Sequence, residues 1–265
     1  MATTIWIVET SAFRTGVDAF EDAVRLAGGE FRPLSVDDEF YGRYGRWEDE
    51  SVVFRGSFEA AESFRRKRPN ARPGVIGEAE ALRCSSYYPT LGDRLLNAEH
   101  ESLPLRDLRP RWSELQARHG DALFVRPDSG AKAFTGGVVA DLDRFEARER
   151  PYLDAMNADD LAVVAPPRRI EAEWRIVVVT GEVVAGSRYK RDGKRDVDPD
   201  LPSDVLAFAQ ATASEIEPPA KAYMLDVARE EGGRLSVVEL NSFSCSDLYA
   251  CAPLPIVEAV QTLSS

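Results

Sequence analysis

Residues 221–241 read KAYMLDVAREEGGRLSVVELN, and this stretch decides the fold. Two runs of mostly strand-forming residues flank Gly232-Gly233, which is typical of a β-hairpin. With these glycines as the two central turn residues, counting outward places Asp226 directly opposite Glu239. Asn241 lies two residues beyond Glu239 and therefore emerges on the same face of the strand. The hairpin thus predicts two carboxylates and one amide close together.

Such a cluster suits a metal ion. Directly opposed residues have Cβ atoms about 4.5–5.5 Å apart, where two like charges are destabilising, so a compensating positive charge is expected. Mg²⁺ usually takes one or two carboxylates and completes its shell with water and phosphate oxygens. We therefore predict Asp226, Glu239 and Asn241 as Mg²⁺ ligands. The alternative is a solvated face on which both acids point to water. Apolar neighbours favour a buried sheet, in which unpaired acids are costly: Met224, Leu225, Val227, Val237, Val238 and Leu240.

A second predicted hairpin, around residues 180–182, carries complementary charges. Glu173 and Arg175 share one face of its first strand, and in either plausible turn register they lie across from Arg188 or Lys190. An exposed ladder of cross-strand ion pairs is the alternative interpretation, and it stays open. Between the two hairpins, residues 203–216 fit a helix. Its predicted core-facing residues are Val205, Leu206, Ala209 and Ala213.

The first 95 residues alternate strand and helix patterns. Strands are predicted at residues 5–8, 51–54 and 74–76, and helices at 17–27 and from Ser57, the predicted N-cap, to residue 66. This alternation favours a small parallel sheet. The predicted domains are residues 1–95, 96–165 and 166–265.

The middle of the chain starts with residues 97–111, taken as a connection because of their charge, Leu and Pro content. A helix at 112–118 and a strand at 122–126 follow, and His119 before Gly120 is typical of a helix C-terminus. The loop at 127–137 is rich in small residues and contains Lys132. It fits either a phosphate contact or an ordinary hairpin loop. A last helix is predicted at 254–263.

Composition excludes several classes of protein. With 265 residues, 44% hydrophobic and 29% charged, the chain is typical of a globular protein with a full core. A net charge of −12 argues against nucleic acid or an anionic membrane as partner. The three cysteines are too scattered for a disulfide framework or a zinc site, and we expect reduced thiols in the cytoplasm. The start of the chain has no signal-peptide pattern. No run approaches the roughly 20 apolar residues needed to span a bilayer.

From about Leu123 to Asp247 the sequence resembles the ATP-grasp superfamily. The resemblance lies in the order of short motifs: residues 124–127 (FVRP), a Gly-containing loop, 163–166 (VVAP), 173–175 (EWR), 188–190 (RYK), then Asp226 and 239–241 (ELN). It implies a small N-terminal α/β domain followed by a two-lobed α+β ATP-grasp fold. In such enzymes ATP lies between the lobes and the adenine meets hinge backbone, here Val164, Ala165 and Pro166. The acid-x-Asn motif holds magnesium.

The resemblance also implies roles for the charged residues. Arg126 corresponds to the basic group that contacts the α- and β-phosphates, and Lys132 to the mobile loop over the terminal phosphates. Arg175 would stabilise the transferring group. Glu173, Arg188 and Lys190 complete the nucleotide site. Arg126 stands where lysine is frequent and Lys190 where arginine is frequent, as in a branch with an arginine-to-lysine exchange, and the two side chains bind phosphate differently.

Family resemblance implies a Mg-ATP-dependent carboxylate–amine ligase that forms an acyl phosphate. The expected substrates are small molecules or peptides, with an amino acid, peptide or protein as acceptor. A phosphotransferase and a non-catalytic nucleotide-binding module remain alternatives, and a homodimer is left open. Cys245, next to the metal strand, fits a buried small residue better than a reactive thiol.

Overall fold

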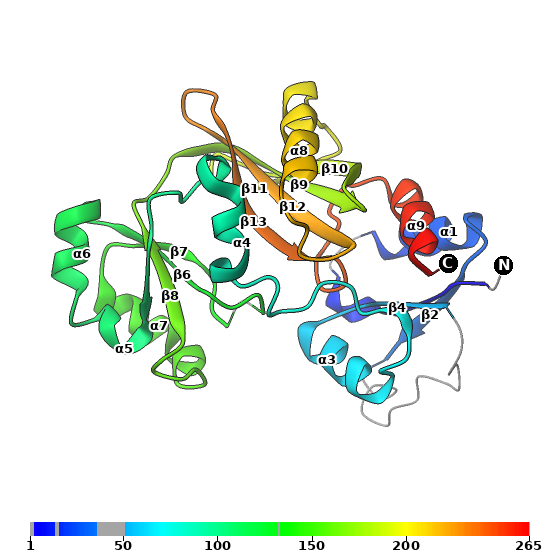
Figure 1. Ribbon diagram of the computed structural model, residues 1–265, viewed down its shortest axis with the longest axis horizontal. Helices are drawn as coiled ribbons and strands as arrows, with labels where there is room; N and C mark the ends of the chain where they lie inside the picture. The colour runs from blue at the N-terminus through cyan, green and yellow to red at the C-terminus, as the bar shows by residue number, and fades with distance from the viewer. Residues whose placement is uncertain (1–2, 14–15, 36–50, 132, 265) are drawn as a thin grey trace. The chain divides into compact units, whose positions relative to one another are not determined.

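The computed structural model describes residues 3–13, 16–35, 51–131 and 133–264 (Figure 1). The chain divides into two compact units. Unit 1 consists of Met1–Glu78 with Ile170–Ser265, and unit 2 is Ala79–Arg169. The domain boundaries expected after residues 95 and 165 stay a prediction. None of the described helices is long and apolar enough to cross a membrane.

Unit 1 contains the predicted parallel sheet, with strand order β2-β1-β3-β4. Its elements are β1 (Ile5–Glu9), the 3-10 turn η1 (Thr10–Ala12), α1 (Val17–Leu26), β2 (Glu30–Leu34), β3 (Ser51–Arg55), α3 (Phe58–Lys67) and β4 (Arg72–Gly74). Ser57 caps α3 as predicted, since its Oγ accepts a hydrogen bond from Ala60 N at 3.2 Å. β4 ends at the residue where the third strand was expected to start. β2 was not predicted, because Pro33 weakens its strand pattern.

A second sheet of unit 1 is antiparallel, with order β11-β10-β9-β12-β13. Its strands and the helices of the same half are β9 (Ile170–Val179), β10 (Glu182–Arg191), β11 (Lys194–Asp198), α8 (Ser203–Glu215), β12 (Ala222–Glu230), β13 (Leu235–Ser242), α9 (Pro253–Gln261) and η3 (Thr262–Ser264). The two predicted hairpins form. Leu206 of α8 is 41% exposed, so its predicted core position is wrong. Thr212 is buried instead and satisfies its hydroxyl by donating to Phe208 O at 2.8 Å.

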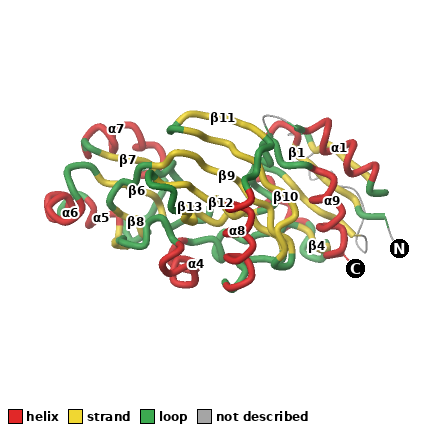
Figure 2. Tube along the Cα trace, turned by 90° about the horizontal axis from the view of Figure 1, so that it is seen from above, coloured by secondary structure: helices red, strands yellow, loops and turns green. Residues whose placement is uncertain are grey.

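The two sheets of unit 1 share a hydrophobic core. Trp6 from β1, Phe20 from α1 and Met224 from β12 belong to one buried cluster, which α9 completes with Ile256. Both views place α9 beside α1 (Figure 2). The opposite face of the parallel sheet packs on α3. Segments far apart in the sequence are therefore fixed against one another inside unit 1.

Unit 2 holds an antiparallel sheet of order β5-β8-β6-β7. Its elements are α4 (Cys84–Leu91), η2 (Gly92–Arg94), β5 (Glu101–Pro104), α5 (Leu105–Leu108), α6 (Trp112–His119), β6 (Leu123–Pro127), β7 (Gly137–Val139), α7 (Leu142–Leu153) and β8 (Leu161–Ala165). The interpretation of residues 97–111 as a connection is wrong, because they form β5 and α5 and bury Leu103 and Leu108. His119 ends α6, as predicted.

Gly77 provides a test of the packing within unit 1. Its φ is +93°, and a Cβ there would lie 2.9 Å from the Cα of Ser242 in β13. We expect Gly77→Ala to lower the free energy of unfolding by at least about 1 kcal/mol more than Gly232→Ala, because only Gly77 adds overpacking to an unfavourable left-handed backbone. Gly232 is the matched control, since its φ is +97° and a Cβ there meets nothing within 4 Å. Urea unfolding measures both; equal losses would contradict the close approach.

Candidate functional site

The register of the β12–β13 hairpin places Asp226 opposite Glu239, as predicted. The turn itself differs from the prediction: Glu230 N donates to Arg234 O at 2.8 Å, so three residues rather than two lie between the paired ends. A three-residue turn alone would shift Asp226 by one position. A β-bulge leaves Val238 without a partner in the register and restores the predicted pairing.

Asp226 is 1% exposed and lies on a central strand of the sheet. Its other neighbour, on β9, is Arg175. Arg175 Nε donates to Asp226 Oδ1 at 2.9 Å and Nη2 donates to Oδ2 at 2.7 Å. Burial acts to lower the pKa of Arg175, but the charge and hydrogen bonds of Asp226 outweigh it and leave that pKa raised. This arginine is the compensating positive charge that the paired carboxylates required.

Asn241 joins the two acids. Its Nδ2 donates to Asp226 Oδ2 at 3.1 Å and to Glu239 Oε1 at 3.0 Å, so all three predicted ligands lie on one face of the sheet. Glu239 is only half-buried, in contrast to Asp226. The set fits Mg²⁺, which takes oxygen ligands and few carboxylates. A half-turn of the Asn241 amide would exchange its nitrogen for its oxygen. In the part of the chain that the structure describes, no three His, Cys, Asp or Glu side chains form a metal-binding group.

One step along the same face, Glu173 pairs with Lys190, as predicted. Lys190 Nζ lies 2.7 Å from Glu173 Oε1, and the hydroxyl of Tyr189 donates to Glu173 Oε2 at 2.6 Å. Glu173 is 5% exposed, whereas the Lys190 side chain is 39% exposed. Lys190 therefore keeps its charge close to solvent while it balances a buried acid.

Arg188 does not join this cluster. It pairs in register with Trp174, and Arg175 faces Ser187, so the expectation that Arg188 lies across from Glu173 or Arg175 is wrong. Two bulges in β10 cause the difference, because each shifts the register by one residue. The Arg188 guanidinium instead lies within 3.5 Å of three acids, Asp196, Asp198 and Asp200.

Two tyrosines that sequence reasoning did not assign complete the surroundings of Arg175. The rings of Tyr189 and Tyr249 stack with centroids 4.9 Å apart and an interplanar angle of 9°. Arg175 lies 5.7 Å from the centroid of Tyr189 and 5.0 Å from that of Tyr249. Burial raises the pKa of both hydroxyls, so both rings are neutral at pH 7. Tyr189 stands in the basic motif at 188–190, but no signal in the sequence distinguishes Tyr249.

The remaining predicted residues belong to unit 2. Arg126 lies in β6 and is 6% exposed; Val164 and Ala165 are fully buried in β8, and Pro166 follows directly. Lys132 lies outside the described residues. After β6 the chain is anchored to α4, because Ser85 donates to Asp128 through both its backbone N and its Oγ, at 2.6 and 2.7 Å.

A buried arginine in unit 1 also escaped the sequence analysis. Arg55, the last residue of β3, is 3% exposed and lines a cavity that contains neither the metal set nor Lys190. Its position at the carboxyl end of a parallel strand is the one signal that was available.

Solved structures with the same fold cover essentially the whole chain. D-cycloserine synthetase DcsG matches with a TM-score of 0.67 at 16% identity, over 99% of this chain and 100% of that one. The ATP-grasp ligase PsnB in complex with a minimal precursor gives 0.58 at 13%, over 99% and 100%. D-alanine–D-alanine ligase from Bacillus anthracis gives 0.58 at 11%, over 99% and 95%. At these identities the likeness establishes the fold, a mixed α/β fold of the ATP-grasp type.

Among curated proteins no sequence matches. A family model, in contrast, covers well over half of the chain. It matches residues 93–260 and describes an ATP-grasp domain, family 3 of its clade. This range includes β6, β8 and the row Arg175, Asp226, Glu239. The chain therefore belongs to the ATP-grasp family.

Proposed function

We propose that this protein is a Mg-ATP-dependent carboxylate–amine ligase that works through an acyl phosphate. The observation that carries the proposal is the row formed by Arg175, Asp226 and Glu239 with Asn241. An arginine held by a buried acid, next to an acid that reaches solvent, combines an electrophilic group with oxygen ligands. Both are needed where phosphoryl charge develops.

In this proposal Asp226, Glu239 and Asn241 would hold Mg²⁺, which neutralises phosphate charge when bound. Arg126, Lys132 and Glu173 would contact the nucleotide, and backbone groups of Val164, Ala165 and Pro166 the adenine. Lys190 would stand in the position where arginine is frequent, as in the branch with an arginine-to-lysine exchange. The predicted nucleotide contact of Arg188 has no support, because this side chain is engaged by acids away from the row.

Arg175 is the residue we assign to the reacting phosphoryl group. Its guanidinium has five N–H groups. Nε and Nη2 bind Asp226, and Nη1 donates to the backbone oxygen of Asp247 at 2.9 Å. The remaining donors can bind an oxygen of the transferring group, and the three fixed bonds hold them in place. The chemistry then needs no side-chain nucleophile: a carboxylate oxygen attacks the γ-phosphorus, ADP leaves, and an amine displaces phosphate.

The substrates are expected among amino acids and peptides. A PsnB structure contains a precursor peptide, and other structures of this fold are named as D-alanine–D-alanine ligase and D-cycloserine synthetase. The net charge of −12 disfavours nucleic acid.

The metal assignment is tested by Glu239→Gln. We expect a folded protein whose Mg-dependent ATP turnover falls by roughly 100-fold or more, because each electrostatic group at the developing charge contributes on that order. Glu231→Gln, in the exposed turn of the same hairpin, is the matched control and should keep full turnover. Unchanged turnover in Glu239→Gln would exclude the assigned site.

The buried ion pair is tested by Arg175→Met. The change leaves Asp226 buried without its charged partner, so the free energy of unfolding should fall by about 3–5 kcal/mol. Adding Asp226→Asn should recover part of this loss. The control is Arg229→Met, which removes the more exposed pair with Asp204 at 2.6 Å and should have a smaller effect. Equal losses in denaturant unfolding would argue against the dependence of Asp226 on Arg175.

The reaction class is tested by hydroxylamine trapping. The protein, Mg-ATP, hydroxylamine and a panel of amino acids and peptides should yield a hydroxamate and ADP, since hydroxylamine captures an acyl phosphate. A stable phosphorylated product in its place would identify a phosphotransferase. Nucleotide binding without turnover across the panel would identify a binding module.

A further inference from the structure

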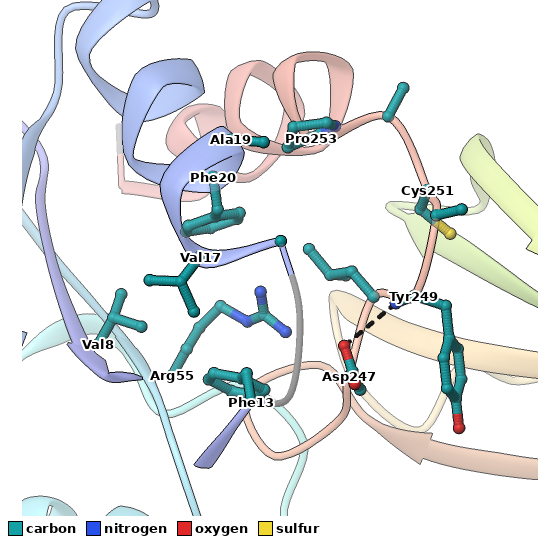
Figure 3. Close-up of a pocket in the computed structure, with 14 residues that line it drawn as sticks. Val8, Phe13, Val17, Ala19, Phe20, Arg55, Asp247, Tyr249, Cys251 and Pro253 are labelled. Atoms are coloured by element: carbon teal, nitrogen blue, oxygen red, sulfur yellow. Dashed lines mark hydrogen bonds between the residues drawn. The ribbon is translucent and has the colours of Figure 1, made fainter. Parts of the chain in front are cut away.

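A cavity of about 250 Å³ lies in unit 1 at the carboxyl end of β3. Its walls come from β1, α1 and the segment between β13 and α9 (Figure 3). Apolar side chains make up most of the lining, among them Val8, Phe13, Val17 and Phe20. The carboxyl ends of parallel strands are where open α/β sheets commonly bind ligands.

Arg55 brings a positive charge into this apolar cavity, and Figure 3 shows its guanidinium directed into the space between α1 and the segment that follows β13. Nη2 donates to Ser246 O at 2.5 Å. The rings of Phe13, Phe20 and Phe243 surround the group, with centroids 4.6, 5.0 and 5.2 Å away. Nε has no hydrogen-bond partner among the described residues. Burial lowers the pKa of Arg55 to about 10, against the opposing charge of Asp247.

A buried guanidinium with an unused donor is unfavourable in the free protein. The aromatic rings offset part of the cost, but they accept no strong hydrogen bond. An anionic group in the cavity would supply the missing acceptor, and a carboxylate matches the planar guanidinium best.

Asp247 contributes the negative charge of the cavity. It is half-buried, and its Oδ1 accepts a hydrogen bond from Tyr249 N at 3.1 Å, which fixes the carboxylate at the cavity wall (Figure 3). Its backbone oxygen accepts from Arg175 Nη1. The acid therefore lies on the side of the cavity that adjoins the Arg175 row, whereas Arg55 lies toward β3.

We propose that this cavity binds a free α-amino acid with an apolar side chain, its carboxylate on Arg55, its ammonium on Asp247 and its side chain among Val17, Phe13 and Phe20. This assignment rests on the proposed ligase function, in which the amino acid is the amine substrate. The paired charges of the cavity match a zwitterion, and the volume suits one small molecule more than a folded peptide.

The binding mode fixes which group of the amino acid reacts. The carboxylate is held by Arg55, away from the row that would receive phosphate, so the amine is the nucleophile. Its nitrogen attacks the acyl carbon of the acyl phosphate and forms the C–N bond. The bond from that carbon to the phosphate oxygen breaks, phosphate leaves with the electron pair, and the two protons lost in turning the ammonium into an amide pass to phosphate and solvent.

The experiment measures binding of phenylalanine and leucine, in both enantiomers, by saturation-transfer NMR and thermal shift. Phenylalaninamide lacks the carboxylate and N-acetylphenylalanine lacks the ammonium. We expect one free amino acid to bind and both derivatives of phenylalanine to bind more weakly. Arg55→Met should weaken binding roughly 10- to 100-fold, which is the range for hydrogen bonds to charged groups. Val17→Trp should weaken it by filling the cavity.

Two controls match these variants. Arg66→Met removes an exposed arginine of α3, and Asp22→Trp adds the same bulk to the exposed side of α1; both should bind like the parent protein. Derivatives that bind as tightly as the free amino acid, or unchanged binding in Arg55→Met and Val17→Trp, would overturn the inference. Calorimetry with Mg-ATP, measured alongside, separates the two proposals. ATP binding without amino-acid binding sinks the cavity assignment alone, and loss of ATP binding sinks the ligase.

Discussion

The site depends on one constraint, the burial of Asp226 on a central strand. A carboxylate that is 1% exposed cannot remain charged without a partner, and the flanking strand supplies Arg175 in a fork with two hydrogen bonds. This pairing also orients Arg175, because both groups are held by backbone ladders on β9 and β12. The neighbouring acid, Glu239, keeps access to solvent and accepts a hydrogen bond from the amide of Asn241. A fixed cation and an accessible acid thus result from a single packing requirement.

The same sheet face changes from apolar to polar along each strand. Val177 and Met224 pack in the core with α1 and α9, and two residues further along, Arg175 and Asp226 form the ion pair. Because side chains on one face repeat every two residues, the strands carry both the core and the charged row without a break in the sheet. The apolar end anchors the strands, and this anchoring makes the geometry of the charged end reproducible.

Sequence reasoning reached the Asp226–Glu239 pair because a hairpin is local, and two errors cancelled: the turn has three residues, and Val238 bulges. In β10 the bulges did not cancel, and Arg188 came out on the wrong face. The pairing of β9 with β12 joins residues 51 positions apart and has no local signal, so Arg175 was assigned by resemblance rather than by register. Leu206 failed for another reason: helical periodicity marks a stripe but not its edges.

Arg55 was hidden from sequence reasoning because its surroundings come from three distant segments, around Phe13, Phe20 and Phe243. Its connection to the rest of the site is nevertheless direct. Arg55 binds the carbonyl of Ser246 and Arg175 binds that of Asp247, so two buried guanidinium groups hold adjacent peptide units. Tyr249, two residues on, has a φ of +53°, an unfavourable value for an aromatic residue. Such strain persists only where the surroundings fix the backbone, and here both arginines and the Tyr189 stack do so. The segment that follows β13 is therefore a rigid wall shared by the cavity and the charged row, which lets a ligand in one be positioned relative to the other.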